Sequence, residues 1–339
     1  MLRWFLRRLL LVLPTLLGIT FVVFLVLDLA PTDRARADVA RRTQQGELAD
    51  QHARAVAVTR LQIRYGLIDP QTLERIPLWR RYLHWLGNAL QLRLAGPDED
   101  QAAFSRRLWS ALQITLLLGS LALLVAIVVG VPLGAYAGMH TGSRGDRATS
   151  AGLFVAMGVP DFLLATLLLL GLGGAWFDLF PAAGLQSDAA ANWAWPRRLF
   201  DRCWHLVLPV GTLAMAPTVL ITRFLRESVA RAADEPFAAN LRAWGCEPGR
   251  MRWRLLRAGA APLATLAGSL LPMLVAGSIV VEQTFSLEGI GRLTWRALQL
   301  QDQPMVMAMT LLSACAILTA LCLSDLAHRL IDPRVRVHG

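Results

Sequence analysis

The sequence predicts an all-α integral membrane protein with six transmembrane helices. Apolar residues make up 55% of the 339-residue chain and the mean hydropathy is positive, a composition typical of membrane proteins. The second observation is a set of apolar segments, most of them close to the roughly 20 residues that a helix needs to cross a bilayer. In chain order they cover about residues 9–30, 112–135, 148–177, 206–221, 260–281 and 305–326.

The first apolar segment is predicted to be an uncleaved membrane helix. A secretory signal peptide is the alternative, because the segment follows the basic stretch MLRWFLRR and the ARA of residues 35–37 resembles a cleavage site. Its apolar core is longer than the roughly 7–15 residues that such peptides have. We therefore favour a span, with residues 1–30 as the N-terminal cytoplasmic residues and the first helix.

Four prolines lie within the third, fourth and fifth segments: Pro160, Pro209, Pro217 and Pro272. Proline is tolerated in a membrane helix where neighbouring helices or water satisfy the backbone groups that it frees. The prolines therefore favour a packed bundle around a pathway, although helix irregularity alone would give the same pattern. The fourth segment is the shortest, and we expect a short span there.

The distribution of arginine predicts that both chain ends lie in the cytoplasm. With that topology, the cytoplasmic ends and loops carry 16 arginines, whereas the two short loops on the other side carry five. Positive residues are enriched in cytoplasmic loops, and this rule operates on short loops only. The long first outside loop, with 13 more arginines, therefore does not enter the comparison.

The long loop separates the first helix from the rest. Residues 31–107 form this extracytoplasmic loop, in which tryptophan and tyrosine alternate with arginine after residue 61. Such amphipathic segments lie at a bilayer surface, but a water-exposed helical subdomain would have the same pattern. Residues 108–328 then form a five-helix core with a cytoplasmic loop at 223–259, and residues 329–339 form a cytoplasmic tail.

The chain contains no lysine, since all 34 basic residues are arginine. A Walker A loop needs lysine to hold nucleotide phosphates, so any ATP that drives this protein is expected on another subunit. Schiff-base chemistry is excluded for the same reason. We expect no cofactor, catalytic residue or metal site, and the four cysteines have neither zinc-site nor disulfide spacing. Membrane topology explains the net charge of +10, and we find no nucleic-acid-binding motif.

Several motifs follow one another along almost the whole chain. They are YGLIDP with RYLHWL, then VGVPLGAYAGMHTGSRGDR, GVPDFLLATLLLL, IVVEQTFSLEGIGRLTWRALQLQDQP and finally LIDPRVR. In this order they resemble the transmembrane permease subunits of bacterial ABC importers of the dipeptide/oligopeptide type. The resemblance implies a type I permease fold in the bacterial inner membrane, in contact with membrane lipid, and no covalent chemistry.

The same resemblance implies the partners of the chain. These would be a second, homologous permease subunit, two ATPase subunits or domains that bind ATP and Mg²⁺, and an extracytoplasmic substrate-binding protein. Transport would proceed by alternating access coupled to ATP hydrolysis. The substrate stays open, because relatives in this family carry dipeptides, oligopeptides, glutathione or metal complexes.

A cytoplasmic stretch between the fourth and fifth segments is the first candidate site. In PFAANLRAWGCEPGRMRWRLLRAG, the sequence predicts two helical turns from Phe237 to Trp244, a left-handed cap at Gly245 and a new helix from Pro248. The resemblance implies that the first of these helices docks into a groove on the ATPase. The predicted ATPase-coupling residues are Phe237, Ala238, Ala239, Asn240, Leu241, Arg242, Trp244 and Gly245.

This stretch departs from the family pattern. Ala239-Asn240-Leu241 stands where the family has a glutamate and two alanines, and Trp244-Gly245 stands where it has lysine and glycine. The apolar edge of the short helix, formed by Phe237 and Leu241, needs packing that a partner groove would provide. Three later arginines share one helix face, and we interpret them as membrane-surface anchors: Arg250, Arg254 and Arg257.

Acidic residues in or near the apolar segments are the second group of candidates. A carboxylate at the bilayer centre costs about 2.5–3.5 kcal/mol on insertion scales, so each needs a reason. Asp161 would cap a kinked helix or face the central cavity, and Glu282 would line the outer mouth of the pathway or pair with Arg292. Both are pathway candidates, and four further residues are predicted gate or structural residues: Pro160, Gly289, Gly291 and Arg292.

Two other acidic residues lie near the ends of apolar segments. Asp28 is close enough to the outer end of the first segment for us to expect a solvated carboxylate. Asp325 lies near the inner end of the sixth segment, and an ion pair with Arg329, four residues on, is the simple interpretation.

Two functions of other classes remain as alternatives. An ion-gradient-driven secondary transporter would work without an ATPase. An intramembrane enzyme would need a nucleophile with its base, or metal ligands, at matching depth. The sequence contains no HExxH or GxSxG motif, and its six histidines are scattered along the chain.

Overall fold

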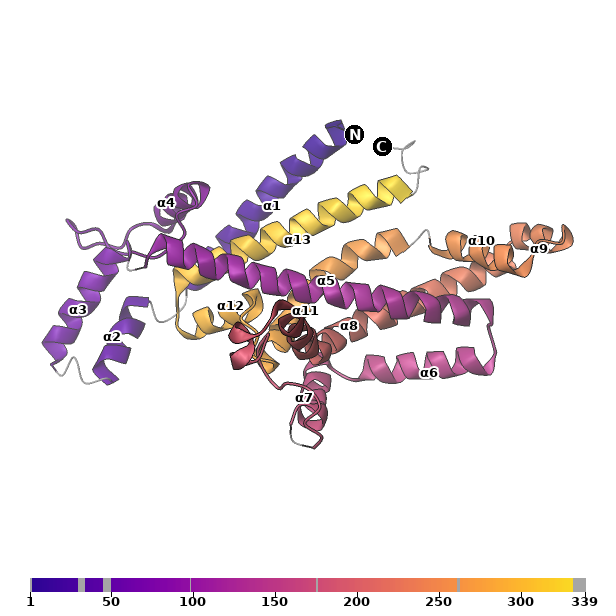
Figure 1. The fold of residues 1–339 in the computed structure, drawn as a ribbon. Coiled ribbons are helices and arrows are strands. Elements are labelled where there is room, and N and C mark those ends of the chain that lie inside the picture. Colours follow the sequence, from indigo (N-terminus) through magenta and orange to yellow (C-terminus); the bar gives the residue numbers. More distant parts are fainter. Residues whose placement is uncertain are drawn as a thin grey trace. The chain divides into compact units, whose positions relative to one another are not determined.

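A computed structural model of the chain describes residues 2–29, 34–44, 50–97, 99–174, 176–260 and 263–331. Within these residues the regular structure is helical, as predicted, and a single β-bridge pairs Ile68 with Arg75 (Figure 1). The chain divides into two compact units. Unit 1 contains Met1–Gln113 and Arg292–Ala316, and unit 2 contains Ile114–Gly291 and Ile317–Gly339.

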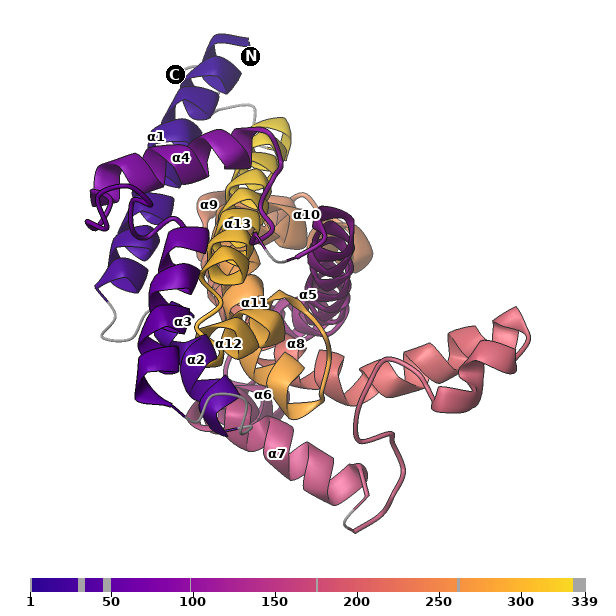
Figure 2. The ribbon, with the colours of Figure 1, turned by 90° about the vertical axis from the view of Figure 1, so that its left-hand side faces the viewer.

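Unit 1 is built from the N-terminal helices and from parts of three helices that also have residues in unit 2. The N-terminal helices are α1 (Leu2–Asp28), α2 (Arg34–Gln44), α3 (Gln51–Arg64) and α4 (Leu78–Leu90), and the shared ones are α5 (Gln101–Met139), α12 (Ile290–Gln299) and α13 (Gln303–Ile331). α4 crosses α1 (Figure 2). Phe24, Tyr82 and Met307 form a buried cluster, in which the Tyr82 hydroxyl lies 2.9 Å from Thr20 Oγ1.

Asp28 is not solvated, contrary to the prediction. Its side chain is 12% exposed and pairs with Arg81, which is 7% exposed, and with Arg75 Nη2 at 3.1 Å. A carboxylate removed from water needs such partners, because its desolvation costs several kcal/mol. The two arginines lie 47 and 53 residues further along the chain, so no local spacing indicates them.

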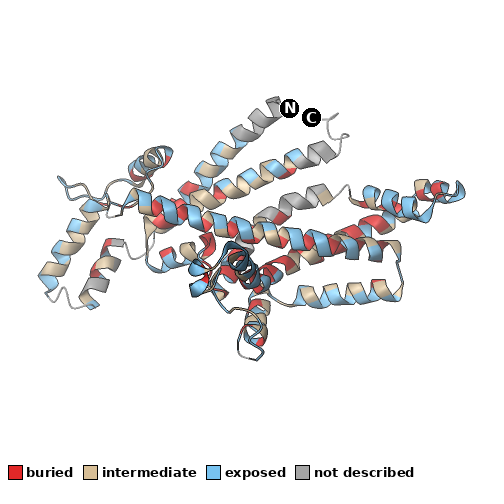
Figure 3. Ribbon diagram, viewed as in Figure 1, coloured by how far each residue is buried: buried red, intermediate tan, exposed pale blue. Residues whose placement is uncertain are grey.

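Unit 2 is built around one long helix, α8. Its other elements are the remaining parts of α5, α12 and α13, together with α6 (Arg144–Gly158), α7 (Asp161–Leu172), a 3₁₀ turn (Asp188–Asn192), α9 (Pro236–Ala243), α10 (Pro248–Ala260) and α11 (Leu263–Thr284), while α8 itself covers Trp195–Asp234. Leu206, Val210 and Leu213 of α8 pack with buried residues of α5, α7 and α11 in the main hydrophobic cluster. Figure 3 shows buried residues in red along α8.

Two glycines let α5 approach α8 closely. A Cβ at Gly134 would lie 2.6 Å from the Thr222 carbonyl oxygen, and one at Gly138 would lie 2.7 Å from the Arg226 carbonyl oxygen. Small residues spaced four apart allow helix backbones to pack closely in membranes. A larger residue at either position would therefore push the two helices apart.

The helix that contains the predicted fourth segment is much longer than that segment. The sequence predicts a span at residues 206–221, but α8 runs unbroken for 40 residues from Trp195 to Asp234, with Pro209 and Pro217 inside it. Hydropathy marks only the apolar part of a helix. Three arginines lie in the part of α8 on each side of this segment, and the later part also has three alanines; both residue types favour helix and extend α8 beyond the apolar segment.

The predicted third span is two helices. α6 ends at Gly158, α7 begins at Asp161, and the pair is bent by 97°. Between them Val159 has an extended backbone (φ −95°, ψ 114°), because proline disfavours the helical conformation of the residue before it. Pro160 therefore ends one helix and precedes another, rather than lying inside a single helix.

Four of the described helices are long and apolar enough to cross a membrane: Leu10–Asp28, Gln101–Met139, Trp195–Asp234 and Gln303–Leu326. The bent pair α6–α7 would be a fifth span. The fifth predicted segment coincides with α11, for which the side chains of residues 264–269, 271 and 275–277 lie outside the described set. The count of six spans and their orientation stay predictions.

The Arg329 side chain, the predicted partner of Asp325, also lies outside the described set.

Candidate functional site

The predicted helix–glycine–helix stretch forms two short helices after α8. Glu235 has an extended backbone (φ −69°, ψ 151°), and α9 begins at Pro236. Proline suits the first helical position because its φ is already helical and the N–H that it lacks would have no partner there. Pro248 begins α10 in the same way, as predicted. We call α9, α10 and the turn between them (residues 236–260) the coupling element.

Gly245 ends α9 in the left-handed conformation, which confirms the predicted cap. Its φ is +68°. Its N–H donates to the Arg242 carbonyl, and the Cys246 N–H donates to the Leu241 carbonyl, both at 3.0 Å. This bond pair is the Schellman motif, which satisfies carbonyl groups that the end of a helix would leave without donors. The motif turns the chain so that α10 can fold back on α9.

Gly245→Ala is expected to lower the free energy of unfolding by about 1 kcal/mol, because a left-handed backbone costs a residue with a Cβ roughly 1–2 kcal/mol. No atom lies within 4 Å of the position of the added Cβ, so the cost is conformational only. Thermal unfolding of the purified chain measures it. Gly249→Ala is the control, since Gly249 lies in α10 with equal space around it and without a positive φ. Equal effects of the two substitutions would contradict the assignment.

The apolar edge of α9 packs on this chain. Ala238 is buried with Ala232 of α8 and Leu255 of α10, and Phe237 packs against this cluster. Arg242 Nη2 also donates to the carbonyl of Ala233 near the end of α8, at 2.6 Å. Helices α8 and α10 therefore provide the support that we expected from a partner groove, and α9 is held in place without a partner.

The outer side of the coupling element is exposed and hollowed. The Trp244 side chain is 84% exposed, and Ala239, Asn240 and Arg242 are exposed beside it. A hollow of about 460 Å³, which we call the coupling hollow, is lined by Phe237, Asn240, Leu241, Trp244, Arg254, Arg257 and Ala258. Six of the predicted coupling residues thus lie on the exposed face or in the hollow, whereas Ala238 is buried beneath them and Gly245 ends the helix.

The structure brings Arg254 and Arg257 into the same hollow as Trp244. We interpreted these arginines as membrane-surface anchors, so the sequence analysis did not predict their place beside α9. The signal was present in two parts: the arginines are three residues apart on one helix face, and the Gly245 turn reverses the chain. Arg250, the third arginine of the series, pairs instead with Glu247 at 3.4 Å.

Glu282 is fully buried in unit 2. Its Oε1 accepts a hydrogen bond from Thr115 Oγ1 at 2.7 Å, and the same Thr115 oxygen accepts one from the Ile290 N–H at 2.9 Å. The carboxylate is thus linked through Thr115 to the first residue of α12. The position favours the structural role over the pathway role for Glu282. Arg292 belongs to unit 1, so the predicted pair of Glu282 with Arg292 stays a prediction.

Gly289 and Gly291 make room for this carboxylate. A Cβ at Gly289 would overlap the carboxyl carbon and both carboxyl oxygens of Glu282, and one at Gly291 would lie 3.0 Å from Oε2 and 2.6 Å from the Cα of Ile279. The predicted structural glycines therefore line the buried Glu282. Glycine is needed at 289 because the carboxylate lies directly against the backbone there, and at 291 mainly because the Ile279 backbone lies close.

Asp161 is the first residue of α7, at the bend after Pro160. Pro160 is the N-cap residue and provides no side-chain hydrogen bond to the helix, whereas a carboxylate in the first turn, such as that of Asp161, is favoured by the positive end of the helix dipole. Asp161 is half-buried, unlike Glu282. Its role as a pathway residue stays a prediction.

A buried ion pair in unit 2 was also not predicted from the sequence. Asp146 in the first turn of α6 is 3% exposed, and both of its oxygens accept from the Arg226 guanidinium of α8, one of them at 2.9 Å from Nη2. Ser143 caps the same helix by accepting the Asp146 N–H. The Ser-x-x-Asp spacing indicates such a cap, but Arg226 lies 80 residues away and only the fold identifies it.

The comparison with known protein families identifies the class. Residues 130–337, more than half of the chain, match the model of the binding-protein-dependent transport system inner membrane component. The matched part contains the α6–α7 bend, α8, the coupling element and the Gly289–Gly291 turn. The chain belongs to this family of inner membrane transport components, and the resemblance drawn from the sequence motifs is confirmed.

Several proteins that are named as transport permeases match this chain over nearly their whole length. The oligopeptide transport system permease protein AppB of Bacillus subtilis (strain 168) is 28% identical, with 98% of each chain covered. The dipeptide transport system permease protein DppB of Escherichia coli (strain K12) is 29% identical, with 99% of each covered. A YejB protein of Agrobacterium fabrum, described as a peptidoglycan transport system permease, is 28% identical.

Proposed function

We propose that this chain is a channel-forming subunit of an ATP-driven importer that moves peptides across the inner membrane. Membership of the binding-protein-dependent transport family supports the importer class. The peptide substrate is supported by the names of full-length relatives, which are described as oligopeptide and dipeptide permeases. The chain would move its substrate by alternating access rather than by covalent chemistry.

The coupling element carries the mechanistic part of this proposal. α9 is held on α8 and α10, while Trp244 and the coupling hollow stay open to solvent. A supported helix with an exposed aromatic anchor suits contact with a moving partner, because a push on α9 passes directly into the 40-residue helix α8. The partner would be an ATPase subunit, and the rigid helices would transmit its closure to the transport cavity.

The remaining partners follow from this arrangement. ATP and Mg²⁺ would bind to two ATPase subunits or domains and not to this chain, which has no lysine for a Walker A loop. A second, homologous permease would complete the channel, and an extracytoplasmic binding protein would deliver the peptide. Asp161 is our candidate for contact with the pathway, whereas the buried contacts of Glu282 support a structural role.

Reconstitution tests the proposal. Proteoliposomes that contain this chain with its second permease, ATPases and binding protein are expected to accumulate a radiolabelled tripeptide only when ATP is supplied. The control contains this chain alone under a proton or sodium gradient. Gradient-driven uptake without an ATPase would overturn the ATP-driven mechanism. If the binding protein stimulates ATP hydrolysis but no peptide accumulates, the ATP-driven mechanism stands. Only the assignment of peptides as the substrate class would then be overturned.

A further inference from the structure

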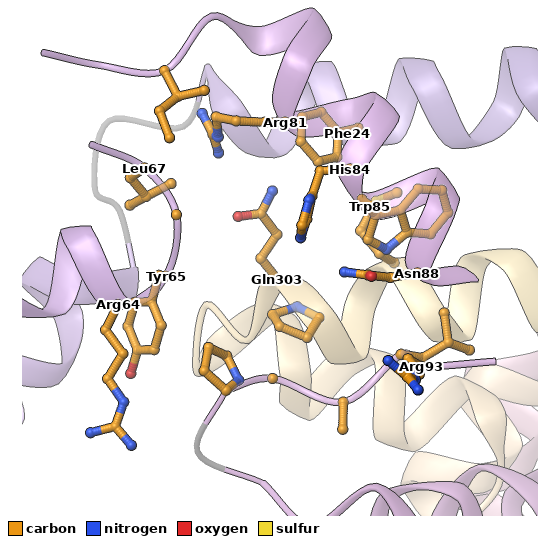
Figure 4. Close-up of a pocket in the computed structure, with 18 of the residues that line it drawn as sticks. Phe24, Arg64, Tyr65, Leu67, Arg81, His84, Trp85, Asn88, Arg93 and Gln303 are labelled. Carbon is orange, nitrogen blue, oxygen red and sulfur yellow. The ribbon is translucent and has the colours of Figure 1, made fainter. Parts of the chain in front are cut away.

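Unit 1 contains a second cavity, apart from the coupling element. It has a volume of about 570 Å³ and lies between α4, the end of α3, the loop at 93–97 and the first residues of α13. Figure 4 shows His84, Trp85 and Asn88 of α4 on one side, Tyr65 and Leu67 on the other, and Gln303 between them. This volume is in the range of small-molecule sites. We call it the α4 pocket.

The α4 pocket is positively charged. Its lining includes four arginines and one histidine, and none of the described residues that line it is acidic: the basic ones are Arg64, Arg80, Arg81, His84 and Arg93. Arg81 is paired with Asp28, so the argument rests on Arg80 and Arg93, both exposed. Neutral donors accompany them, including Asn88, Gln303 and the indole N–H of Trp85, which is buried and has no acceptor among the described residues. This set of donors suits a phosphate group.

The pocket lies at the ends of two apolar helices of unit 1. Phe24 lies in the last turns of the candidate span Leu10–Asp28, and Gln303 is the first residue of the candidate span Gln303–Leu326. A pocket lined by the ends of spans is at the depth of the lipid headgroups rather than of the hydrocarbon core. The depth of the pocket therefore matches that of a phospholipid phosphate.

α4 itself has the surface of a helix that lies on a bilayer. Trp79, Leu83 and Leu90 are 57%, 55% and 81% exposed, and their spacing of four and seven residues places them on one face. The pocket-lining residues Arg80, His84 and Asn88 are spaced four apart on an adjacent face. An exposed apolar face beside a basic one is typical of helices whose apolar side enters the boundary between headgroups and acyl chains.

We propose that the α4 pocket binds the phosphate headgroup of an anionic phospholipid, with Arg80 and Arg93 as its cationic ligands. The acyl chains would lie along the exposed apolar face of α4, and Asn88 and Gln303 would donate to the headgroup oxygens. The site would hold α4 at the membrane surface. Because Arg81 of α4 pairs with Asp28, it would hold the end of α1 there as well.

Native mass spectrometry of the full-length chain in detergent tests this site. The chain is titrated separately with phosphatidylglycerol, with phosphatidylethanolamine and with inorganic phosphate. We expect phosphatidylglycerol to bind at least about tenfold more tightly than phosphatidylethanolamine. Arg80→Gln with Arg93→Gln is expected to weaken phosphatidylglycerol binding about 25-fold, since each arginine near an anionic surface contributes about fivefold.

Arg60→Gln with Arg106→Gln is the matched control. Both arginines are exposed residues of unit 1 and lie outside the pocket, so the same charge is removed elsewhere and binding should be unchanged. Equal binding of the two lipids, or equal loss in the two double variants, would overturn the site. Inorganic phosphate that binds as tightly as phosphatidylglycerol would overturn the lipid as occupant. If the double variant does not fold, Arg93→Gln alone gives the same comparison, with about a fivefold loss expected.

Discussion

Trp244→Ala is expected to weaken the association of this chain with its ATPase about 30-fold and to reduce ATP-driven uptake in proportion. A buried aromatic anchor at a protein interface contributes about 2 kcal/mol or more, which corresponds to about 30-fold in a dissociation constant. Trp244 can be such an anchor only in a complex, because its side chain is 84% exposed in this chain. The substitution should therefore leave the Tm of the isolated chain unchanged.

Trp253→Ala separates this expectation from a general effect of losing an exposed tryptophan. Trp253 lies on α10, is 65% exposed and does not line the coupling hollow. Co-purification of the ATPase with each variant measures association, and uptake by proteoliposomes measures transport. The assignment of the coupling hollow fails if the two variants lose ATPase to the same extent, or if Trp244→Ala binds it as the unchanged chain does.

The coupling element could be predicted almost to the residue because its signals are local. Pro236 and Pro248 begin helices through their fixed φ, and Gly245 ends one because glycine adopts a positive φ without strain. Each signal acts within a few residues, so the sequence alone is sufficient. The coupling hollow could be predicted only in part, because Arg254 and Arg257 reach Trp244 through the fold-back of α10.

Ion pairs between residues that are distant in the chain could not be predicted from the sequence. Asp28 finds Arg81 53 residues away, and Asp146 finds Arg226 80 residues away. Each acidic residue has several arginines within similar sequence distance, and no spacing rule selects among them. The α4 pocket is of the same kind: aromatic and basic residues in the loop indicated a surface-active segment, but Gln303 comes from more than 200 residues further on.

Helix lengths were a second limit. Hydropathy correctly located α1, α5, α8 and α13, but it placed the ends of α8 at the ends of its apolar part. The polar flanks of α8 continue as helix on both sides, and the later flank is the one that reaches α9. A prediction that marks only apolar residues therefore leaves a gap between the transmembrane part and the coupling element, whereas in the structure α8 continues to Asp234 and α9 begins at Pro236.

Gly289→Ala is expected to be the most destabilising small substitution considered, with a loss of about 3 kcal/mol in the free energy of unfolding. The added Cβ would overlap the buried carboxylate of Glu282, and overpacking of this kind costs about 1–3 kcal/mol. Displacing the carboxylate would also break its hydrogen bond from Thr115 Oγ1, which leaves buried polar groups without partners at roughly 1–3 kcal/mol. Thermal unfolding of the purified chain in detergent measures the effect.

A double variant identifies the cause of that loss. In the double variant Gly289→Ala with Glu282→Ala the overlapping carboxyl atoms are gone. Its loss in the free energy of unfolding should therefore be smaller than the sum of the losses in the two single variants by about 1–3 kcal/mol, as expected for residues in contact. Gly211→Ala in α8 is the control, because no atom lies within 4 Å of its added Cβ and alanine is the better helix former. Additive losses in the double variant would show that Glu282 and Gly289 are not in contact. The carboxylate would then be available to the pathway instead of being held against the Gly289–Gly291 turn.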